Sequence, residues 1–554
     1  MRKKYHILLL SLILSILTST GFVYKVLDDD NDFEIVKNLD IFHSVIRDLN
    51  IYYVDEIDAQ YLIGIAIESM LNRLDPYTVY YPESKIEDYL FLSTGTYAGI
   101  GAIVSPRDNQ LIVTEILEKM PAHIAGLKTG DIIISIDGFS TKDKDLEMMS
   151  NKLNGQINSN LVLEILRENN PKPITLNIKR NKIEQDDIPY FGIISDSVGY
   201  IKLAGFNREA ASKVRTAFLS LKSKGMNKLV LDLRDNPGGL LIEAVGIVNL
   251  FVDKGSEIVS IKGKDKDANK VFYATVEPID KTIPITVLIN GMSASASEIV
   301  SGALQDLDRA VIVGQRSYGK GLVQNTKDLS YNTKIKITTA KYYIPSGRCI
   351  QALDYSHRNS DGTVNKVADS LTNEFKTKNG RSVFDGGGIN PDLIVYNKDF
   401  ENFVADLDKN FLIFDFITNY LNTNAVADSA ADLDIGESGF VKFQSFLKAN
   451  SDRFITKVDS DIEDIKKNLI QESGSNTKLA EAIKSLKFEY DKEKGNSAMS
   501  FKKSLIPLLN KRISKRLYFE RGFILNSLSN DDILFEAIII LKNKNQYNKI
   551  TRNF

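Results

Sequence analysis

The chain has few of the residues on which many protein classes depend. With Cys349 as its single cysteine it can form neither an intramolecular disulfide framework nor a thiolate metal cluster. A net charge of −2 argues against a nucleic-acid-binding protein. No HExxH, P-loop or paired-cysteine zinc motif is present, so we expect no metal and no cofactor. The 554 residues, 43% hydrophobic and 26% charged, are enough for three or four domains with sizeable cores.

The first residues have the pattern of a targeting segment. Arg2, Lys3 and Lys4 precede an apolar run from Ile7 to Leu17. A basic start and a short apolar run are typical of an export signal, so residues 1–24 are predicted to be a signal peptide or a signal anchor. No cysteine follows, which excludes a lipoprotein anchor. The protein is therefore expected in the periplasm or on the outer face of the cytoplasmic membrane.

Residues 28–92 have a helical pattern. Apolar residues recur at steps of three and four from Leu39 to Tyr53, and Asp58 is placed to cap a helix over residues 59–73. The stretch LDPYTVYY, residues 74–81, ends this helix at Pro76 and is predicted to form a turn.

Residues 95–183 have a different pattern, which predicts a small β-rich module. Strands are expected at 111–116, 161–166 and 174–178, and a short helix at 145–153. The glycines of Gly99, Ile100, Gly101 and Ala102 permit a tight loop at its start. The segment AGLKTGD, residues 125–131, precedes one more apolar strand.

The most informative stretch runs from Asn290 to Gln324. A strand at 285–289 is followed by small residues and then by an amphipathic helix that begins near Ile299. Small residues at a strand-to-helix turn allow a substrate to approach closely and leave the first N–H groups of the helix free for a negative charge. The turn contains Ser293, Ser295 and Ser297 as candidate nucleophiles.

A serine hydroxyl becomes a nucleophile only when a base takes its proton. None of the four histidines lies near this turn in the sequence (His6, His43, His123 and His357), so a Ser-His-Asp triad is not expected. Lys320 lies between glycines after the next apolar run. Burial would lower its pKa until the neutral amine could act as the base.

A second turn can stabilise a developing oxyanion. A buried strand at 228–233 leads into RDNPGG, residues 234–239, and a helix follows at 240–251. Gly238 or Gly239 is predicted to supply one oxyanion N–H donor, and Ala296 the other.

SASASE followed by SYGKGLVQ resembles the active-site signature of the carboxyl-terminal processing peptidases, or tail-specific proteases. That resemblance implies a Ser-Lys dyad of Ser295 and Lys320, with Gln324 orienting the lysine and Glu298 close to the dyad. It also implies a crotonase-like core of repeated ββα units over residues 188–396. LDPYTVYY and ITTAKYYIPSGRCIQ, residues 337–351, match further elements of the family. Cys349, which lies in the second of them, is predicted to be a packing residue.

The β-rich module resembles a PDZ domain, which binds an extended C-terminal peptide as an added strand. The resemblance implies that Gly99 to Ala102 hold the peptide carboxylate. The fold class expected is thus a multidomain α/β protein with helical N- and C-terminal regions, a PDZ domain and a peptidase core. Expected partners are proteins or peptides with free C-termini, with an adaptor or the membrane as further candidates and no nucleic acid.

The segment from 399 to 554 is predicted to be a helical extension without a catalytic signature. One helical face is predicted from Leu505, Ile506, Leu508, Leu509, Ile513 and Leu517. The last 54 residues carry 11 Lys/Arg against 4 Asp/Glu, for which a solvated basic face is the simplest interpretation and attraction to a membrane or an acidic partner the alternative. The polar insertion at 352–387 either borders the cleft or is a surface loop.

Two other functions compete with the peptidase. The same fold could serve as a non-catalytic peptide-binding scaffold, which the joint presence of Ser295, Lys320 and Gln324 disfavours. A crotonase-type acyl-CoA enzyme is disfavoured by the leader and the PDZ-like module.

Overall fold

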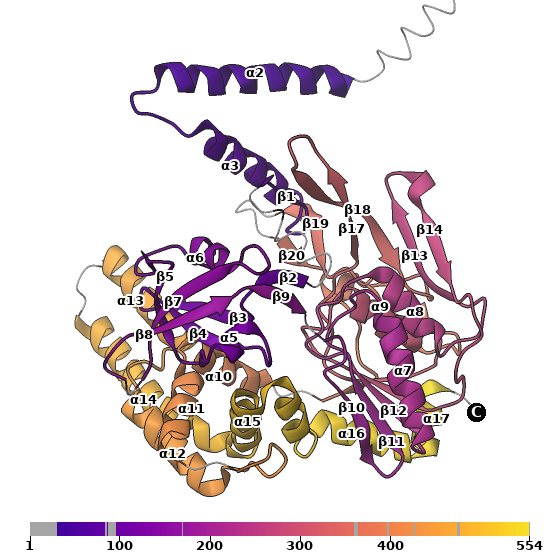
Figure 1. Cartoon of the computed structure of the whole chain (residues 1–554). Coiled ribbons are helices and arrows are strands. Elements are labelled where there is room, and N and C mark those ends of the chain that lie inside the picture. The colour runs from indigo at the N-terminus through magenta and orange to yellow at the C-terminus, as the bar shows by residue number, and fades with distance from the viewer. Residues whose placement is uncertain are drawn as a thin grey trace, which may run out of the picture.

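The computed structural model describes residues 30–83, 86, 96–168, 170–184, 186–358, 364–395, 398–424, 427–473 and 477–552. The predicted export signal, residues 1–24, lies outside these ranges. Within the described ranges, every helix is too short or too polar to cross a bilayer. Figure 1 shows a helical N-terminal region, a PDZ-sized β module, a larger α/β core and a set of C-terminal helices.

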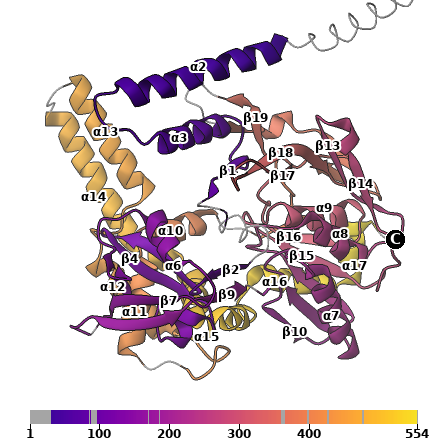
Figure 2. The same ribbon diagram turned by 45° about the horizontal axis from the view of Figure 1, so that its top comes forward.

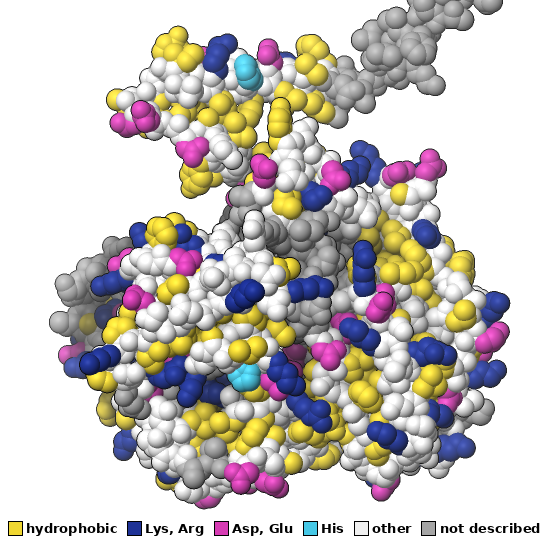
Figure 3. All heavy atoms as spheres, in the orientation of Figure 1, with side chains coloured by type: hydrophobic (Ala, Val, Ile, Leu, Met, Phe, Trp, Pro, Cys, Tyr) yellow, Lys and Arg dark blue, Asp and Glu magenta, His cyan; other side chains and the backbone are white. Residues whose placement is uncertain are grey.

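The N-terminal region consists of α2 (Asp30–Tyr52) and α3 (Ala59–Asn72). Asp58 caps α3 as predicted, because its side chain accepts the N–H of Tyr61. Figures 1 and 2 both place α2 at the outside of the molecule, and Figure 3 shows apolar side chains gathered on this part. The chain then enters β1 (Val79–Tyr81), which belongs to a sheet of the α/β core.

The next module is a small antiparallel sheet with two short helices. Its strand order is β3-β4-β5-β7-β8, so β3 is an edge strand, and β6 pairs with β5. The strands are β3 (Ala102–Arg107), β4 (Gln110–Ile116), β5 (Ile132–Ile136), β6 (Phe139–Ser140), β7 (Asn160–Leu166) and β8 (Ile174–Lys179). The helices are α5 (Pro121–Ile124) and α6 (Leu146–Leu153). At the base of the module, β2 (Thr96–Gly99) pairs with β9 (Asn181–Glu184). These elements confirm the strands and the helix that the sequence predicts here.

The core is built on a six-stranded sheet of order β10-β11-β12-β15-β16-β23. Its strands are β10 (Tyr190–Ser195), β11 (Val198–Lys202), β12 (Lys228–Asp232), β15 (Ile285–Ile289), β16 (Val311–Gly314) and β23 (Leu393–Ile394). All neighbours are parallel except β10 and β11. The central strands are predominantly apolar, as expected for parallel strands with helices on both faces of the sheet.

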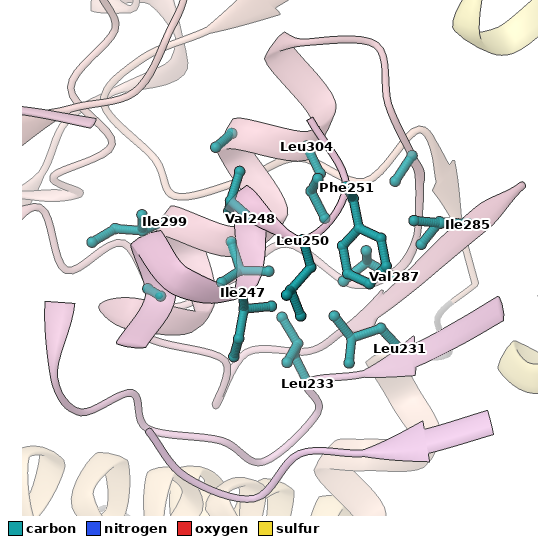
Figure 4. Packing of buried hydrophobic residues seen from close by; sticks show 14 of the residues in the cluster. Leu231, Leu233, Ile247, Val248, Leu250, Phe251, Ile285, Val287, Ile299 and Leu304 are labelled. Carbon is teal, nitrogen blue, oxygen red and sulfur yellow. The ribbon is translucent and has the colours of Figure 1, made fainter. Parts of the chain in front are cut away.

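One face of this sheet is covered by α7 (Ala210–Ser223), α8 (Leu241–Asn249) and α9 (Ala296–Asp306). Figure 4 shows Leu231 and Val287 of the strands beside Phe251, which follows α8, and Val248 of α8 belongs to the same buried cluster. Because the nucleophile turn and the RDNPGG turn both leave carboxyl ends of neighbouring parallel strands, this packing brings them to one edge of the sheet.

A second, antiparallel sheet stands beside the first. It contains β1, β18 (Lys334–Tyr343), β13 (Glu257–Gly263) and β14 (Lys270–Tyr273) in that order, and β17 (Leu322–Asp328) pairs with β18. A 3-10 turn, η2 (Lys266–Ala268), joins β13 and β14. Pairing of β1 with β18 therefore carries LDPYTVYY from the N-terminal region into the core.

The insertion at 352–387 forms two small hairpins, and one of them borders the candidate site. They are β19 (Leu353–Arg358) with β20 (Val364–Lys366), and β21 (Glu374–Lys376) with β22 (Ser382–Phe384); η3 (Asp369–Leu371) lies between them. The ring of Tyr355 in β19 packs edge-on against Tyr77, with centroids 6.2 Å apart.

The C-terminal segment is helical, as predicted. The helices are α10 (Lys398–Lys409), α11 (Leu412–Thr423), α12 (Gly436–Ala449), α13 (Lys457–Ser473), α14 (Thr477–Ser500), α15 (Lys502–Ser527), α16 (Asp532–Lys542) and α17 (Lys544–Thr551). The predicted apolar face of α15 packs on α10 to α12. The predicted solvated basic face is found in part: Lys544 and Lys549 of α17 are exposed, whereas on α15 Arg512 pairs with Asp408 at 2.6 Å and Lys515 with Glu115 of the PDZ-like module at 2.9 Å.

Candidate active site

The nucleophile turn joins β15 to α9, and its three serines have different environments. Ser293 and Ser297 are fully buried, and their hydroxyls donate to the carbonyls of Leu233 and Asn236. Ser295 is half-buried and precedes α9 with φ 54° and ψ −111°. Such a backbone costs on the order of 1–3 kcal/mol and is typical of functional sites. The two flanking serines are thus bonded inside the protein, and Ser295 is the most accessible of the three.

Asn236 joins the two turns. Its side chain is fully buried; the amide donates to the carbonyl of Leu203 and the oxygen accepts the N–H of Gly238. Its own carbonyl accepts the N–H of Ala294 at 3.1 Å. Asp235 and Asn290 exchange two further hydrogen bonds between the turns, at 3.0 and 2.8 Å. The RDNPGG turn is therefore fixed against the nucleophile.

The predicted oxyanion residues lie around Ser295. A side chain on Gly238 would meet Ser295 Cβ at 2.8 Å and the Ala296 N at 2.9 Å. The N–H of Gly238 already donates to Asn236, whereas the N–H of Gly239 donates no hydrogen bond within the described residues. Ala296 is the first residue of α9, where helical N–H groups lack intrahelical acceptors. Gly239 and Ala296 are the predicted donors that fit this arrangement.

Glu298 is fully buried and connects the nucleophile to the lysine loop. One carboxylate oxygen accepts the backbone N–H groups of both Ser295 and Lys320, at 2.8 and 2.9 Å. The other accepts the Ser317 hydroxyl and the Gly319 N–H, at 2.5 and 2.7 Å. Burial raises the pKa of Glu298 to about 7, although these donors act against the shift. Glu298 therefore does more than cap α9, because it also accepts hydrogen bonds from the loop that carries Lys320.

Lys320 has the environment that a lysine base needs. Burial lowers its pKa to about 8, and the positive charge of Lys336 contributes, while Glu298 and Asp75 act in the opposite direction. Its Nζ lies 4.4 Å from the centre of the Tyr77 ring. Within the described residues no hydrogen bond joins this nitrogen to the Ser295 hydroxyl, a bond that often forms only when substrate is bound.

Gln324 is in β17, beside a bulge in its pairing with β18. Its amide donates to the hydroxyl of Thr338 at 3.2 Å, and Thr338 in turn donates to Asp75 at 3.1 Å. Among the described residues no hydrogen bond links Gln324 to Lys320, so its orienting role stays a prediction.

Sequence reasoning missed the contribution of Asp75 and Tyr77. Asp75 is 6% exposed, and its carboxylate accepts the N–H groups of Tyr77 and Thr78 at 2.8 and 2.9 Å. These bonds hold the backbone at Tyr77, whose ring lies over Lys320, and burial raises the pKa of Tyr77 well above its usual value. The pairing of β1 with β18 places both residues at the site. The resemblance of LDPYTVYY to a family element was the one signal in the sequence.

The predicted carboxylate-binding loop lies at the open edge of the PDZ-like sheet. The Ile100 and Gly101 carbonyls accept the N–H groups of Ala122 and Leu117. Gly101 has φ 73°, and a Cβ there would lie 2.4 Å from Met120 Cβ, so glycine is required. With Gly99 and Ala102 on either side, the loop leads directly into edge strand β3.

The remaining candidates lie away from this chemistry. Burial raises the pKa of the Cys349 thiol, which leaves it a poor nucleophile. His123 accepts the N–H of Lys119 and packs on Phe519. The part of the chain that the structure describes holds no group of three or more histidine, cysteine and acidic side chains suited to a metal.

Three family descriptions match successive parts of the chain. Residues 98–179 match a PDZ domain, residues 197–356 match peptidase family S41, and residues 403–541 match the C-terminal helical domain described as "Probable PDZ-protease". The S41 match includes the nucleophile turn and Lys320. With the fold, these matches define a serine protease that carries a PDZ domain.

Curated relatives narrow this class. A carboxy-terminal-processing protease of Bartonella bacilliformis is 36% identical over 328 residues, which cover 58% of this chain and 75% of that protein. A "Probable CtpA-like serine protease" of Staphylococcus aureus is 34% identical over 56% of this chain and 62% of that protein, less than two thirds of its length. A solved photosystem II D1 C-terminal processing protease is 29% identical, with a TM-score of 0.36, over 56% of this chain and 89% of that one. The chain belongs to the carboxy-terminal-processing protease family.

Proposed function

We propose that this protease cleaves peptide bonds near the C-termini of protein substrates with Ser295 as nucleophile and Lys320 as general base. One observation carries the proposal: a single buried oxygen of Glu298 accepts the N–H groups of both residues, so their backbones are held together. Burial also gives Lys320 a pKa of about 8, at which a useful fraction of the amine is neutral near physiological pH.

The proposed reaction has two steps. The neutral Lys320 amine takes the Ser295 proton as the hydroxyl oxygen attacks the scissile carbonyl, and the N–H groups of Gly239 and Ala296 bind the oxyanion. The ammonium returns its proton to the leaving amine, the C–N bond breaks and an acyl-enzyme remains. Lys320 then deprotonates a water, whose oxygen attacks the acyl carbonyl; the ester bond to Ser295 breaks, and the Lys320 ammonium returns its proton to the serine oxygen. Gln324 keeps its predicted orienting role, and the chemistry needs no cofactor.

The core that carries this site is proposed to be of the crotonase type. The two strands β10 and β11 followed by α7, and the strand–helix units β12–α8 and β15–α9, support that assignment. The alternative function, a non-catalytic peptide-binding scaffold, is distinguished from the protease by peptide cleavage, because a scaffold would leave every peptide intact.

Recruitment by the PDZ domain is the second part of the proposal. The edge strand β3 can accept an added strand, and the preceding loop from Gly99 to Ala102 can bind its carboxylate. Purified protein is expected to cleave a peptide with a free apolar C-terminus faster than the same peptide with an amidated end, because the amide lacks the negative charge. Initial rates for the matched pair, measured at subsaturating concentration, check this.

Two controls sharpen the comparison. Ser295→Ala is expected to leave both peptides intact; cleavage by that variant would contradict the proposed nucleophile. Equal cleavage rates for the free-acid and the amidated peptide with the unmodified enzyme would show that the loop from Gly99 to Ala102 does not bind the substrate carboxylate.

We also propose that the catalytic domains lie beyond the cytoplasmic membrane, on the basis of the basic and apolar start of the sequence. Protease added to intact spheroplasts is then expected to degrade the chain while a cytoplasmic marker survives. Immunoblotting over time measures this. If the chain resists the added protease for as long as the cytoplasmic marker does, its catalytic domains lie on the cytoplasmic side of the membrane.

A further inference from the structure

The last two helices are part of the catalytic core. α16 and α17 cover the face of the main sheet opposite α7 to α9, and Leu534, Ala537 and Ile540 pack against Val230 and Leu288. The Tyr547 hydroxyl accepts the N–H of Ile285 at 3.0 Å. Figure 1 shows α15 running from the helical bundle to the sheet, where α16 and α17 follow. The C-terminal segment therefore contacts the strands from which both catalytic turns start.

Asp531, just before α16, also reaches the RDNPGG turn. Its side chain is 8% exposed and lies 2.7 Å from the guanidinium of Arg234. The same guanidinium lies 2.6 Å from Asp232, which is 1% exposed. One largely buried arginine at the start of the turn is thus held by two carboxylates, one from β12 and one from a residue nearly 300 positions later in the chain.

The charges around this arginine fix its place. Asp232 also contacts Lys202 at 3.4 Å and accepts the hydroxyl of Tyr200 at 2.7 Å. Burial works against ionisation of Asp531, but Arg234 outweighs it and leaves the pKa of Asp531 lowered. Lys511 on α15 adds a further positive charge nearby, and burial lowers its pKa. Asp232 and Asp531 are thus the two carboxylates that contact Lys202 and Arg234, and removal of the Asp531 charge leaves the arginine with one carboxylate partner among several positive charges.

Arg234 begins the RDNPGG turn, which contains the proposed oxyanion donor Gly239. Its carbonyl accepts the Lys202 ammonium at 2.5 Å, and the residues that follow it bond to the nucleophile turn through Asp235 and Asn236. The turn then reaches Gly238, whose close approach to Ser295 leaves no room for a side chain. Arg234 is thus the first residue of a turn whose later residues bond to the nucleophile turn and end at Gly239, one of the two proposed oxyanion donors.

We infer that Asp531 is a positioning residue for catalysis: through Arg234 it fixes the turn that binds the oxyanion, so that the C-terminal helical region completes the active site of the peptidase core. This inference rests on the proposed roles of Ser295 and of the 234–239 turn. A merely structural role is the competing explanation, because Asp531 also caps α16 by accepting the N–H of Leu534 at 3.1 Å.

The substitution Asp531→Asn separates the two roles. Asparagine caps helices as well as aspartate does, so α16 keeps its cap while the charge on Arg234 is lost. In the purified full-length enzyme we expect kcat to fall by about tenfold to a hundredfold with KM nearly unchanged, since small misplacements of catalytic groups have effects of this size. Asp532→Asn, on the exposed neighbouring residue, is the matched control and is expected to match the wild type.

Binding of a transition-state analogue distinguishes a positioning role from a loss of stability, because a stability change alone leaves the inhibition constant of the folded enzyme unchanged. A peptide aldehyde forms a hemiacetal with the nucleophilic serine, and its inhibition constant is expected to rise by the same factor by which kcat/KM falls in Asp531→Asn. Melting temperatures of all variants show whether they are folded. If Asp531→Asn is too unstable, Asp531→Ser, which keeps a capping oxygen, takes its place.

The outcomes are separable. A folded Asp531→Asn enzyme with kcat within twofold of the wild type, or one that loses only melting temperature, overturns the inference. Turnover by Ser295→Ala overturns the proposed function instead, whatever Asp531→Asn does.

Discussion

Lys320→Arg is expected to abolish peptide hydrolysis at every pH, by ~10³-fold or more, because members of a catalytic dyad act as a unit. Arginine keeps the positive charge and much of the side-chain length, but a guanidinium does not give up its proton near neutral pH. The substitution therefore separates a base from a group that acts by charge alone. Rates of cleavage across pH 6–10 measure it, with Ser295→Ala as the inactive reference.

The pH profile of the unmodified enzyme has a defined direction. Lys320 acts as the neutral amine, so kcat/KM should rise with pH through the lysine pKa and level off above it. Burial places that limb at about 8, well below the usual value for a lysine. Substantial activity of Lys320→Arg, or a profile that falls as pH rises through 8, would show that the lysine is not the base.

Gly238→Ala is expected to lower kcat by about a hundredfold or more, the scale on which loss of oxyanion stabilisation acts. The added Cβ would lie 2.7 Å from the Ala294 carbonyl oxygen and 2.8 Å from Ser295 Cβ, contacts that backbone atoms cannot easily relieve. Its φ of 102° is also unfavourable for an L side chain. The nucleophile turn or the RDNPGG turn must therefore shift. Steady-state kinetics with the free-acid peptide measure the loss.

Gly225→Ala is the matched control for backbone strain. Gly225 has φ 90°, close to that of Gly238, but a Cβ there would meet no atom within 4 Å. We expect this variant to lose roughly 1 kcal/mol of stability and keep its kcat. An equal loss of kcat in both variants would mean that strain in general, and not crowding at Ser295, lowers the rate.

Much of the architecture was predictable because short apolar and turn patterns in the sequence indicate individual strands and helices. The run Ile285–Ile289 is uninterrupted and apolar, and the structure has a strand with those bounds. The predicted start of the next helix was late by three residues. Ala296 and Ser297 carry no amphipathic signal, yet both are helical because Ser295 takes the N-cap position and Glu298 accepts its N–H.

The candidate site was predictable only in part. Ser295 and Lys320 stand out through a motif, and the choice among three serines follows once the hydroxyls of Ser293 and Ser297 are seen to be bonded inside. Of the two glycines left open, Gly238 has its N–H occupied by a side chain two residues earlier. The hydrogen bond from Gly238 to Asn236 depends on the backbone conformation of the turn, and the sequence of the turn is compatible with more than one conformation.

The order of the parts, the nucleophile turn, the lysine loop and the glycine turn all follow from local sequence patterns, because strand and helix periodicity, small residues and turn residues act within a few positions. The contacts of Tyr77 with Lys320 and of Asp531 with Arg234 become apparent in the folded chain alone. The physical reason is the range of the interactions: hydrophobic burial and ion pairing join residues hundreds of positions apart once the sheet, its covering helices and the paired strands β1 and β18 are in place.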